Sequence, residues 1–362
     1  MGTSGRFIGI LVSSAGSAGT YSFQGNVITA ISVSGSSSGT DISAPFAGIL
    51  MISGGAANYG TTAPNVIGSS TTPASITFST TSTSSADVYG IYHFPLSNCN
   101  MTNNVVGGIN VSNTTTAALV FYGLRQFTGT SQTNIFVNNK VGTASAPIQV
   151  SSSGTGSRVV GIYSQSGITT MIGNTVNNIS INSPNTGTGT SASAIGIWIS
   201  STASGHNIEA NTVENVTNTN STAAVSVSGI VYDGGGTGVV QRNLIRGLAT
   251  PNTTSSAGIV AGISVTSGTT TFRNNMIALG SGMSNSPQIR GIDESAGTNN
   301  FYYNSVYISG TATSGSGNSH AFHSTVTVNA RNYRNNIFYN GRSNSGGATG
   351  THYAIRVGGT GT

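Results

Sequence analysis

The sequence predicts an all-β protein, a right-handed parallel β-helix solenoid of about eleven coils with about 34 residues in each coil. Three observations predict this fold: a composition that favours strands, a Gly-Ile motif that returns once per coil, and an Asn motif that returns with the same period. We expect residues 1–362 to form a single β-helix.

The composition favours strands over helices and a folded chain over a disordered one. Only 5% of the residues are charged, the net charge is +5 and 36% of the residues are hydrophobic, so the chain can bury a core. Apart from Ala, good helix formers are sparse, whereas Val, Ile, Thr, Tyr and Phe are plentiful. The composition therefore predicts an all-β protein.

The first motif is a Gly or Ala that follows an apolar segment and usually precedes Ile. Its copies lie about 34 residues apart, at Gly9, Gly48, Gly90, Gly123, Gly161, Gly196, Gly229, Gly262, Gly291, Ala321 and Ala354. Each copy is expected to begin a new coil, in which the Gly occupies a tight corner where a Cβ atom would crowd the neighbouring coil.

The second motif is Asn followed two positions later by Val, Ile or Phe, and it falls between successive copies of the first motif. Its asparagines are Asn26, Asn65, Asn104, Asn139, Asn174, Asn211, Asn243, Asn275, Asn304 and Asn336. In parallel coils, equivalent residues stack at the strand spacing of about 4.8 Å. We therefore expect these asparagines to form a buried ladder of side-chain amides that bond from coil to coil.

The segments between each Asn strand and the next Gly-Ile strand are rich in Ser, Thr and Gly and vary in length, as at 34–40 and 185–191. We expect them to form loops on one side of a rod roughly 50 Å long. Helical repeats would need more helix formers, a propeller of ten or eleven blades would exceed the usual four to eight, and immunoglobulin-like domains would repeat at about 100 residues.

Residues 301–324 and 333–357 contain the phrases NSVYISG and NNIF. They resemble repeats of large secreted or cell-surface proteins of Bacteroidetes-type bacteria, which have pectin-lyase-like parallel β-helical regions ahead of a separate C-terminal sorting domain. This resemblance implies a repeat type rather than an activity. It implies an extracellular or cell-surface location in a bacterium.

Neither end of the chain shows a polar cap, so we expect a piece of a longer protein or a unit whose ends are covered by neighbours. Uncovered coil ends favour a homo-oligomer or filament formed end to end. The scattered Arg residues predict no nucleic-acid binding, and no apolar run is long enough to span a membrane as a helix. Cys99 is the single cysteine, and we expect no metal site and no cofactor.

The sequence carries no convincing catalytic site, and the alternative to a non-catalytic rod is a polysaccharide lyase or glycoside hydrolase. The best constellation for that alternative is Asp233 and Asp293 with Arg290, because glycoside hydrolysis needs two nearby carboxylates. Asp293, His323 and Arg356 occupy the same motif position on three successive coils and predict an outward column of charges. His93 and His206 show no partner in the sequence.

A second outward column places Tyr92, Arg125, Tyr163 and Trp198 on four successive coils. A row of aromatic faces suits contact with a polysaccharide, because sugar C–H groups pack on aromatic rings. The alternative is that loops fold over these side chains and bury them. The function expected from the sequence is therefore a structural or adhesive extracellular rod that contacts glycans through this column.

Overall fold

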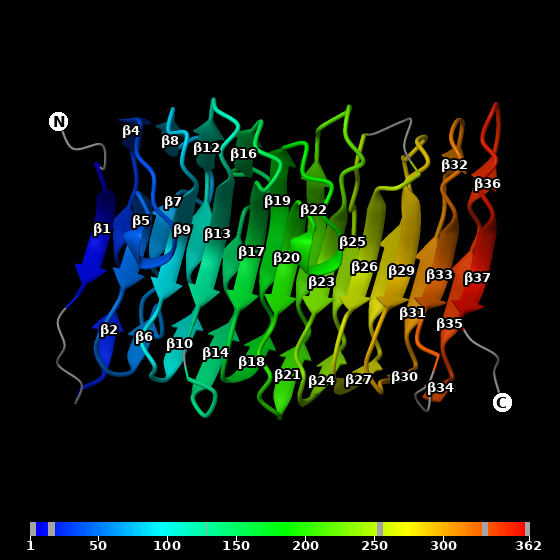
Figure 1. Cartoon of the computed structure of the whole chain (residues 1–362). Coiled ribbons are helices and arrows are strands. Elements are labelled where there is room, and N and C mark those ends of the chain that lie inside the picture. The colour runs from blue at the N-terminus through cyan, green and yellow to red at the C-terminus, as the bar shows by residue number, and fades with distance from the viewer. Residues whose placement is uncertain (1–4, 14–18, 128, 252–255, 328–331, 359–362) are drawn as a thin grey trace.

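The chain folds into a parallel β-solenoid, in which successive coils stack in sequence order along one axis (Figure 1). The computed structural model describes residues 5–13, 19–127, 129–251, 256–327 and 332–358. Within these residues every pairing between strands is parallel. The predicted fold class is confirmed.

Three long sheets, here named A, B and C, run the length of the solenoid. In the described residues, sheet A consists of β1 (Phe7–Val12), β5 (Phe46–Met51), β9 (Ala86–His93), β13 (Leu119–Gln126), β17 (Arg158–Ser164), β20 (Ala194–Ile199), β23 (Val227–Tyr232), β26 (Ile259–Val265), β29 (Gln288–Glu294), β33 (Ser319–Ser324) and β37 (His352–Val357). Each of these strands carries one copy of the Gly-Ile motif.

Sheet B follows sheet A in each coil. Its described strands are β2 (Tyr21–Phe23), β6 (Ala57–Tyr59), β10 (Cys99–Thr102), β14 (Thr133–Val137), β18 (Ile168–Ile172), β21 (His206–Glu209), β24 (Thr237–Gln241), β27 (Thr269–Arg273), β30 (Asn300–Tyr302) and β34 (Asn332–Arg334).

Sheet C begins directly after the motif asparagine of each coil. Its main described strands are β3 (Val27–Ile28), β7 (Val66–Gly68), β11 (Val105–Gly107), β15 (Lys140–Val141), β19 (Thr175–Asn182), β22 (Thr212–Asn218), β25 (Leu244–Arg246), β28 (Met276–Leu279), β31 (Ser305–Ile308) and β35 (Ile337–Asn340). The described part of the chain thus makes ten complete turns, and β37 begins an eleventh.

Part of the variable segment that was expected to be loop is strand. In the first four coils this segment contains β4 (Ile31–Gly35), β8 (Ile76–Thr80), β12 (Ile109–Asn113) and β16 (Ile148–Ser152), which extend sheet C and pair onward to β19. The segments also hold two 3-10 turns, η1 (Asp41–Ser43) and η2 (Gly189–Ser191), and late in the chain β32 (Thr311–Ala312) pairs with β36 (Ser343–Asn344).

The core lies inside the coil, where the aliphatic residues of all three sheets meet. Strand β9 shows how the Gly-Ile motif contributes to this core. Val88 and Ile91 point into the core, whereas Tyr89 and Tyr92 belong to a second apolar cluster on the outer face of sheet A. The three-residue spacing breaks the usual alternation of a strand at Gly90. The motif glycine therefore lies within the strand, rather than at a corner between strands.

The corner between sheets B and C is made by the residue that precedes each motif asparagine. That residue has a positive φ in most coils, for example +60° at Asn103 and +52° at Asn138. Asn adopts this left-handed conformation more readily than most residues, which explains the repeated Asn-Asn pairs. The first Asn of such a pair makes the turn, and the second enters the ladder.

Candidate functional site

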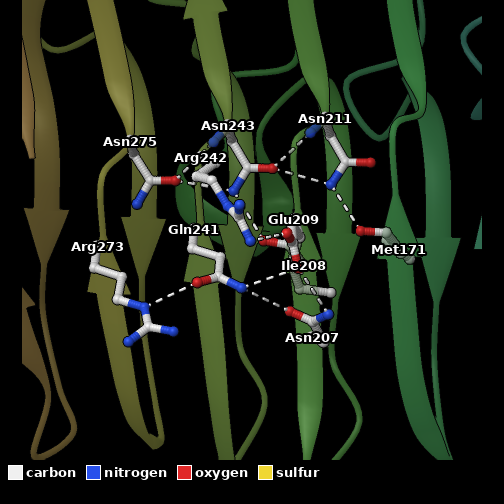
Figure 2. Close-up of polar contacts among 10 residues, drawn as sticks. All are labelled: Met171, Asn207, Ile208, Glu209, Asn211, Gln241, Arg242, Asn243, Arg273 and Asn275. Carbon is white, nitrogen blue, oxygen red and sulfur yellow. Dashed lines mark hydrogen bonds and ion pairs between the residues drawn. The ribbon is translucent and has the colours of Figure 1, made fainter.

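The ten motif asparagines form one column of hydrogen bonds through the solenoid. Each side-chain amide donates to the Oδ1 atom of the next asparagine at 2.8–3.0 Å, from Asn26 to Asn336 without a gap. Figure 2 shows Asn211, Asn243 and Asn275 in this arrangement.

Each interior step of the ladder also satisfies the second amide hydrogen. Asn211 Nδ2, for example, donates to the backbone carbonyl of Met171 at 3.0 Å as well as to Asn243 Oδ1 (Figure 2). Its own Oδ1 accepts from the backbone N–H and the Nδ2 of Asn174. Because buried amides are costly when unpaired, this complete pairing makes the ladder a structural element rather than a binding site.

The column Tyr92–Arg125–Tyr163–Trp198 is in register on β9, β13, β17 and β20, as expected, but the prediction that it faces solvent is wrong. Tyr92, Arg125 and Tyr163 are 0%, 9% and 6% exposed, and only Trp198 is half-buried. Ile42 and Ala192, from the loops that carry η1 and η2, pack in the same apolar cluster. The loops thus cover this part of the outer face of sheet A, and only Trp198 of the column is partly exposed.

The buried column surrounds Arg125 with tyrosine rings. Its guanidinium carbon lies 4.7 Å from the ring centroid of Tyr92 and 4.9 Å from that of Tyr122, and Nη1 donates to the hydroxyl of Tyr89 at 2.6 Å. Such cation–π contacts gain strength when they are desolvated. Arg125 also lies 3.5 Å from a carboxylate oxygen of Asp41.

The carboxylate of Asp87 completes this cluster by accepting from the Tyr89 hydroxyl at 2.8 Å and from the backbone N–H of Asp41 at 2.9 Å. Burial raises the pKa of Asp87, against the opposing effects of these two hydrogen bonds and of Arg125. Burial alone would lower the pKa of Arg125. The surrounding tyrosines outweigh burial, so the pKa of Arg125 is raised and the guanidinium stays charged. The cluster fixes the η1 loop to sheet A.

A second polar cluster lies on the outer face of β29 and β33. Asp293 is paired with His323 in register, and its Oδ1 lies 2.8 Å from His323 Nδ1. Arg290 donates to both carboxylate oxygens at 3.0 and 2.8 Å. Burial alone would raise the pKa of Asp293, but the hydrogen bond from His323 and the charge of Arg290 lower it below its usual value.

Asp233 and Asp293, the carboxylates of the alternative enzyme hypothesis, have different hydrogen-bond partners. Asp233 follows β23 and accepts a hydrogen bond from the hydroxyl of Thr266 at 2.5 Å, whereas Asp293 bonds to Arg290 and His323. Arg356 is in register with His323, as the sequence predicted, but Arg290 rather than Arg356 pairs with Asp293.

The two histidines that showed no partner in the sequence are buried and hydrogen-bonded. His93 Nδ1 lies 2.9 Å from the hydroxyl of Tyr59, and His206 Nδ1 accepts from the backbone N–H of Thr169 at 3.1 Å. Burial lowers the pKa of His93 to about 4 and also lowers that of His206. These rings are neutral parts of the core, which sequence reasoning missed because their partners lie on other strands or in other coils.

The exposed side of sheet B carries a network of charged and amide groups (Figure 2). Glu209 pairs with Arg242, and it accepts from Gln241 and Asn207 at 3.0 and 3.1 Å. Gln241 in turn accepts from Arg273 Nε at 2.8 Å. The ion pair of Glu209 and Arg242 joins neighbouring coils, and exposed pairs of this kind contribute little stability.

A groove on the outer face of sheet C is the feature that the sequence did not suggest. Two adjoining hollows of about 510 and 450 Å³ share Thr219 as a lining residue. The larger is lined by Thr77, Phe78, Ser79, Asn110, Val111, Ser112, Gln149, Val150, Ser151, Ser180, Asn182 and Thr219. The signal that could have located it is the repeated pattern Ile-polar-Val-polar, as in Ile109–Ser112.

No protein-family model matches this chain, and searches of curated proteins and of solved structures give no match either. Within the described residues, no group of three or more His, Cys, Asp or Glu side chains is placed to hold a metal ion. The same residues contain no helix that is both long enough and apolar enough to cross a membrane.

Proposed function

We propose that this chain is a non-catalytic structural rod of an extracellular or cell-surface bacterial protein. The observation that carries the proposal is the uninterrupted Asn ladder from Asn26 to Asn336, which joins every complete turn to the next. A solenoid of this kind is stabilised by contacts between neighbouring coils, so its length can separate two attached structures at a fixed distance.

The use of the polar side chains supports a structural role. Arg125 and Asp87 hold the η1 loop against sheet A. Asp293 joins β29 to β33, and Glu209 joins β21 to β24. The resemblance of residues 301–324 and 333–357 to repeats of secreted Bacteroidetes-type proteins supports the extracellular location. In the alternative, a polysaccharide lyase or glycoside hydrolase, Asp233 and Asp293 would have to act together, yet they bond to different partners.

Association end to end is a further part of the proposal. Strand β37 has an unpaired edge in the described residues, and its core-facing Ile355 is 52% exposed. A second copy could add its β1 to this edge, because an unpaired strand edge accepts another strand.

Two measurements test the proposal. Small-angle scattering is expected to give a rod of constant cross-section roughly 50 Å long, which lengthens with concentration in steps of one copy. Incubation with a panel of acidic and neutral polysaccharides is expected to release no products with either the unaltered protein or Asp293→Asn. Turnover that the Asp293→Asn variant loses would establish an enzyme and overturn the non-catalytic role.

A further inference from the structure

The outward side chains of sheet C form two polar columns along the rod. The first runs through Ser32, Thr77, Asn110, Gln149, Ser180 and Thr217, and the second through Ser34, Ser79, Ser112, Ser151 and Asn182. The intervening residues, such as Ile109 and Val111, face the core. Each column therefore repeats its hydrogen-bonding groups at the strand spacing of about 4.8 Å.

These columns form the floor of the groove on sheet C. The groove crosses β8, β12, β16 and β19 in succession and continues past β22 to residues 249–251 and 282–285. Its course follows the direction in which the coils stack, so it suits a long, extended ligand rather than a compact one.

Part of the polar floor is used within the molecule: Thr77 donates to Ser32, and Asn182 accepts from Asn220. Other polar groups on the floor are unused. Among the described residues, the side chains of Asn110, Ser112 and Gln149 make no hydrogen bond, in contrast to the fully paired amides of the ladder. Thr250 provides a second, independent observation. It is 3% exposed and lines the continuation of the groove, yet its hydroxyl has no hydrogen-bond partner. A buried hydroxyl without a partner is costly, and a ligand in the groove would supply one.

The chemistry of the lining defines the class of ligand. No lining residue is charged, which disfavours nucleic acids, acidic polymers and metal ions. The groove also lacks the exposed Trp, Tyr and Arg anchors of protein interfaces. Hydroxyl and amide groups can both donate and accept, and this matches the hydroxyls of a sugar chain.

We propose that this groove binds an uncharged polysaccharide, extended along the rod axis, through the polar columns of sheet C. The inference rests on the proposed function as a non-catalytic rod and adds to it the class of ligand and the surface that holds it. The groove lies on sheet C, whereas the buried column of Tyr92, Arg125 and Tyr163 lies on sheet A, so the two sites are separate.

The test is equilibrium binding of the whole chain to immobilised polysaccharides in about 0.15 M salt, which screens the net charge of the protein. The neutral probes are hydroxyethyl cellulose, mixed-linkage β-glucan, xyloglucan and galactomannan, and the acidic probes are alginate and polygalacturonate. We expect at least one neutral polymer to bind and the acidic polymers not to bind. Absence of binding to all four neutral polymers, or binding to the acidic ones alone, would overturn the proposal.

The location of the site is tested by the double variant Asn110→Ala/Gln149→Ala. Loss of two hydrogen-bonding amides is expected to weaken binding about tenfold or more. The matched control is Asn58→Ala, because Asn58 is a half-buried residue on the outer face of sheet B whose side chain likewise makes no hydrogen bond with the described residues. Equal weakening by the control, or none by the double variant, would remove this groove as the site.

Thr250→Val separates binding from folding. The substitution removes an unpaired hydroxyl while keeping the shape, so the free protein is expected to be at least as stable as before, whereas binding is expected to weaken severalfold. Unchanged binding would exclude Thr250 and the continuation of the groove from the site. None of these outcomes depends on turnover, so a failure of the groove is distinguishable from a failure of the non-catalytic role.

Discussion

Val106 occupies the space that a side chain at position 90 would need. A Cβ atom on Gly90 would lie 2.6 Å from Val106 Cγ1 and 2.4 Å from the carbonyl oxygen of Gly123 in the next coil. The same relationship recurs in the other coils whose motif residue is Gly, for example between Gly161 and Val176. The Gly-Ile motif and the aliphatic residue of the Asn motif are therefore the two sides of one packing contact.

Gly161→Ala is expected to lower the free energy of unfolding by about 1–3 kcal/mol, because overpacked cores force backbone shifts. The new Cβ would lie 2.5 Å from the carbonyl oxygen of Gly196, which belongs to the backbone and cannot rotate away. Urea unfolding followed by circular dichroism measures the change. Gly347→Ala is the control, since a Cβ there meets no atom within 4 Å. Equal effects at both positions would contradict the packing account.

Asn174→Ala is expected to destabilise the solenoid by roughly 3 kcal/mol or more, because each buried polar group left unpaired costs about 1–3 kcal/mol. The backbone N–H and the Nδ2 of Asn139 lose their shared acceptor, and the carbonyl of Phe136 loses the donor Nδ2 of Asn174. The Oδ1 of Asn211 keeps the backbone N–H of residue 174 as a donor and loses only the side-chain one. Asn26→Ala removes one ladder contact from a half-buried position and is expected to cost clearly less. Similar unfolding midpoints for the two variants would show that the ladder contributes no stability beyond side-chain packing.

Ala210→Asn is expected to stabilise the protein by about 1 kcal/mol. Ala210 makes the turn before a ladder asparagine with φ +54°, where Asn is favoured over Ala. The thermal unfolding midpoint should rise. The reverse change, Asn138→Ala at φ +52°, should lower it. A fall for Ala210→Asn would mean that this turn is governed by packing rather than by backbone conformation.

The protein is expected to lose stability between about pH 6.5 and pH 4 through its buried histidines. Burial lowers the pKa of His93 to about 4, below the ordinary value near 6.5 that applies in the unfolded chain. The folded state therefore binds the proton more weakly, so its stability is complete above pH 6.5 and decreases as the pH falls through this window. Burial also lowers the pKa of His320 to about 4, which adds a second contribution of the same sign.

His93→Gln is expected to remove up to about 3 kcal/mol of this loss at pH 4. Gln suits the site because Gln126 occupies the equivalent buried position in the next coil. Urea titrations from pH 7.5 to pH 4 measure the slope. The carboxylate of Asp293 has a lowered pKa, so its contribution to the free energy of unfolding is complete above its ordinary pKa near 3.8. That contribution is lost only at lower pH, outside the window of the histidines. An unchanged slope in His93→Gln would show that His93 is not the group responsible.

Arg125→Ala is expected to cost about 3–5 kcal/mol, because it leaves the buried carboxylate of Asp87 without its cation. Arg125→Lys keeps the charge but loses the planar contacts with Tyr92 and Tyr122, and its cost should be smaller. Polysaccharide binding per folded molecule should be unchanged in both variants. Weakened binding in a variant that remains folded would return sheet A to consideration as a glycan surface.

The sequence alone determined the features that depend on period. A parallel solenoid places each residue over its equivalent one coil away, so the recurrence of Gly90 with Gly123, and of Asn174 with Asn211, was enough to predict stacked strands and the register between them. The same logic placed Asp293 beside His323.

Only the tertiary structure decided which outer faces are covered and which are open. Tyr92 and Arg125 are buried because aperiodic loops, with Asp41 in one of them, fold across sheet A, and no repeat predicts the path of such a loop. The polar residues around Asn110 and Gln149 stay open because the segments beside them form strands rather than loops. Periodicity specifies which residues of successive coils stack on one another. Contacts between different segments of the same coil depend instead on the length and packing of each loop.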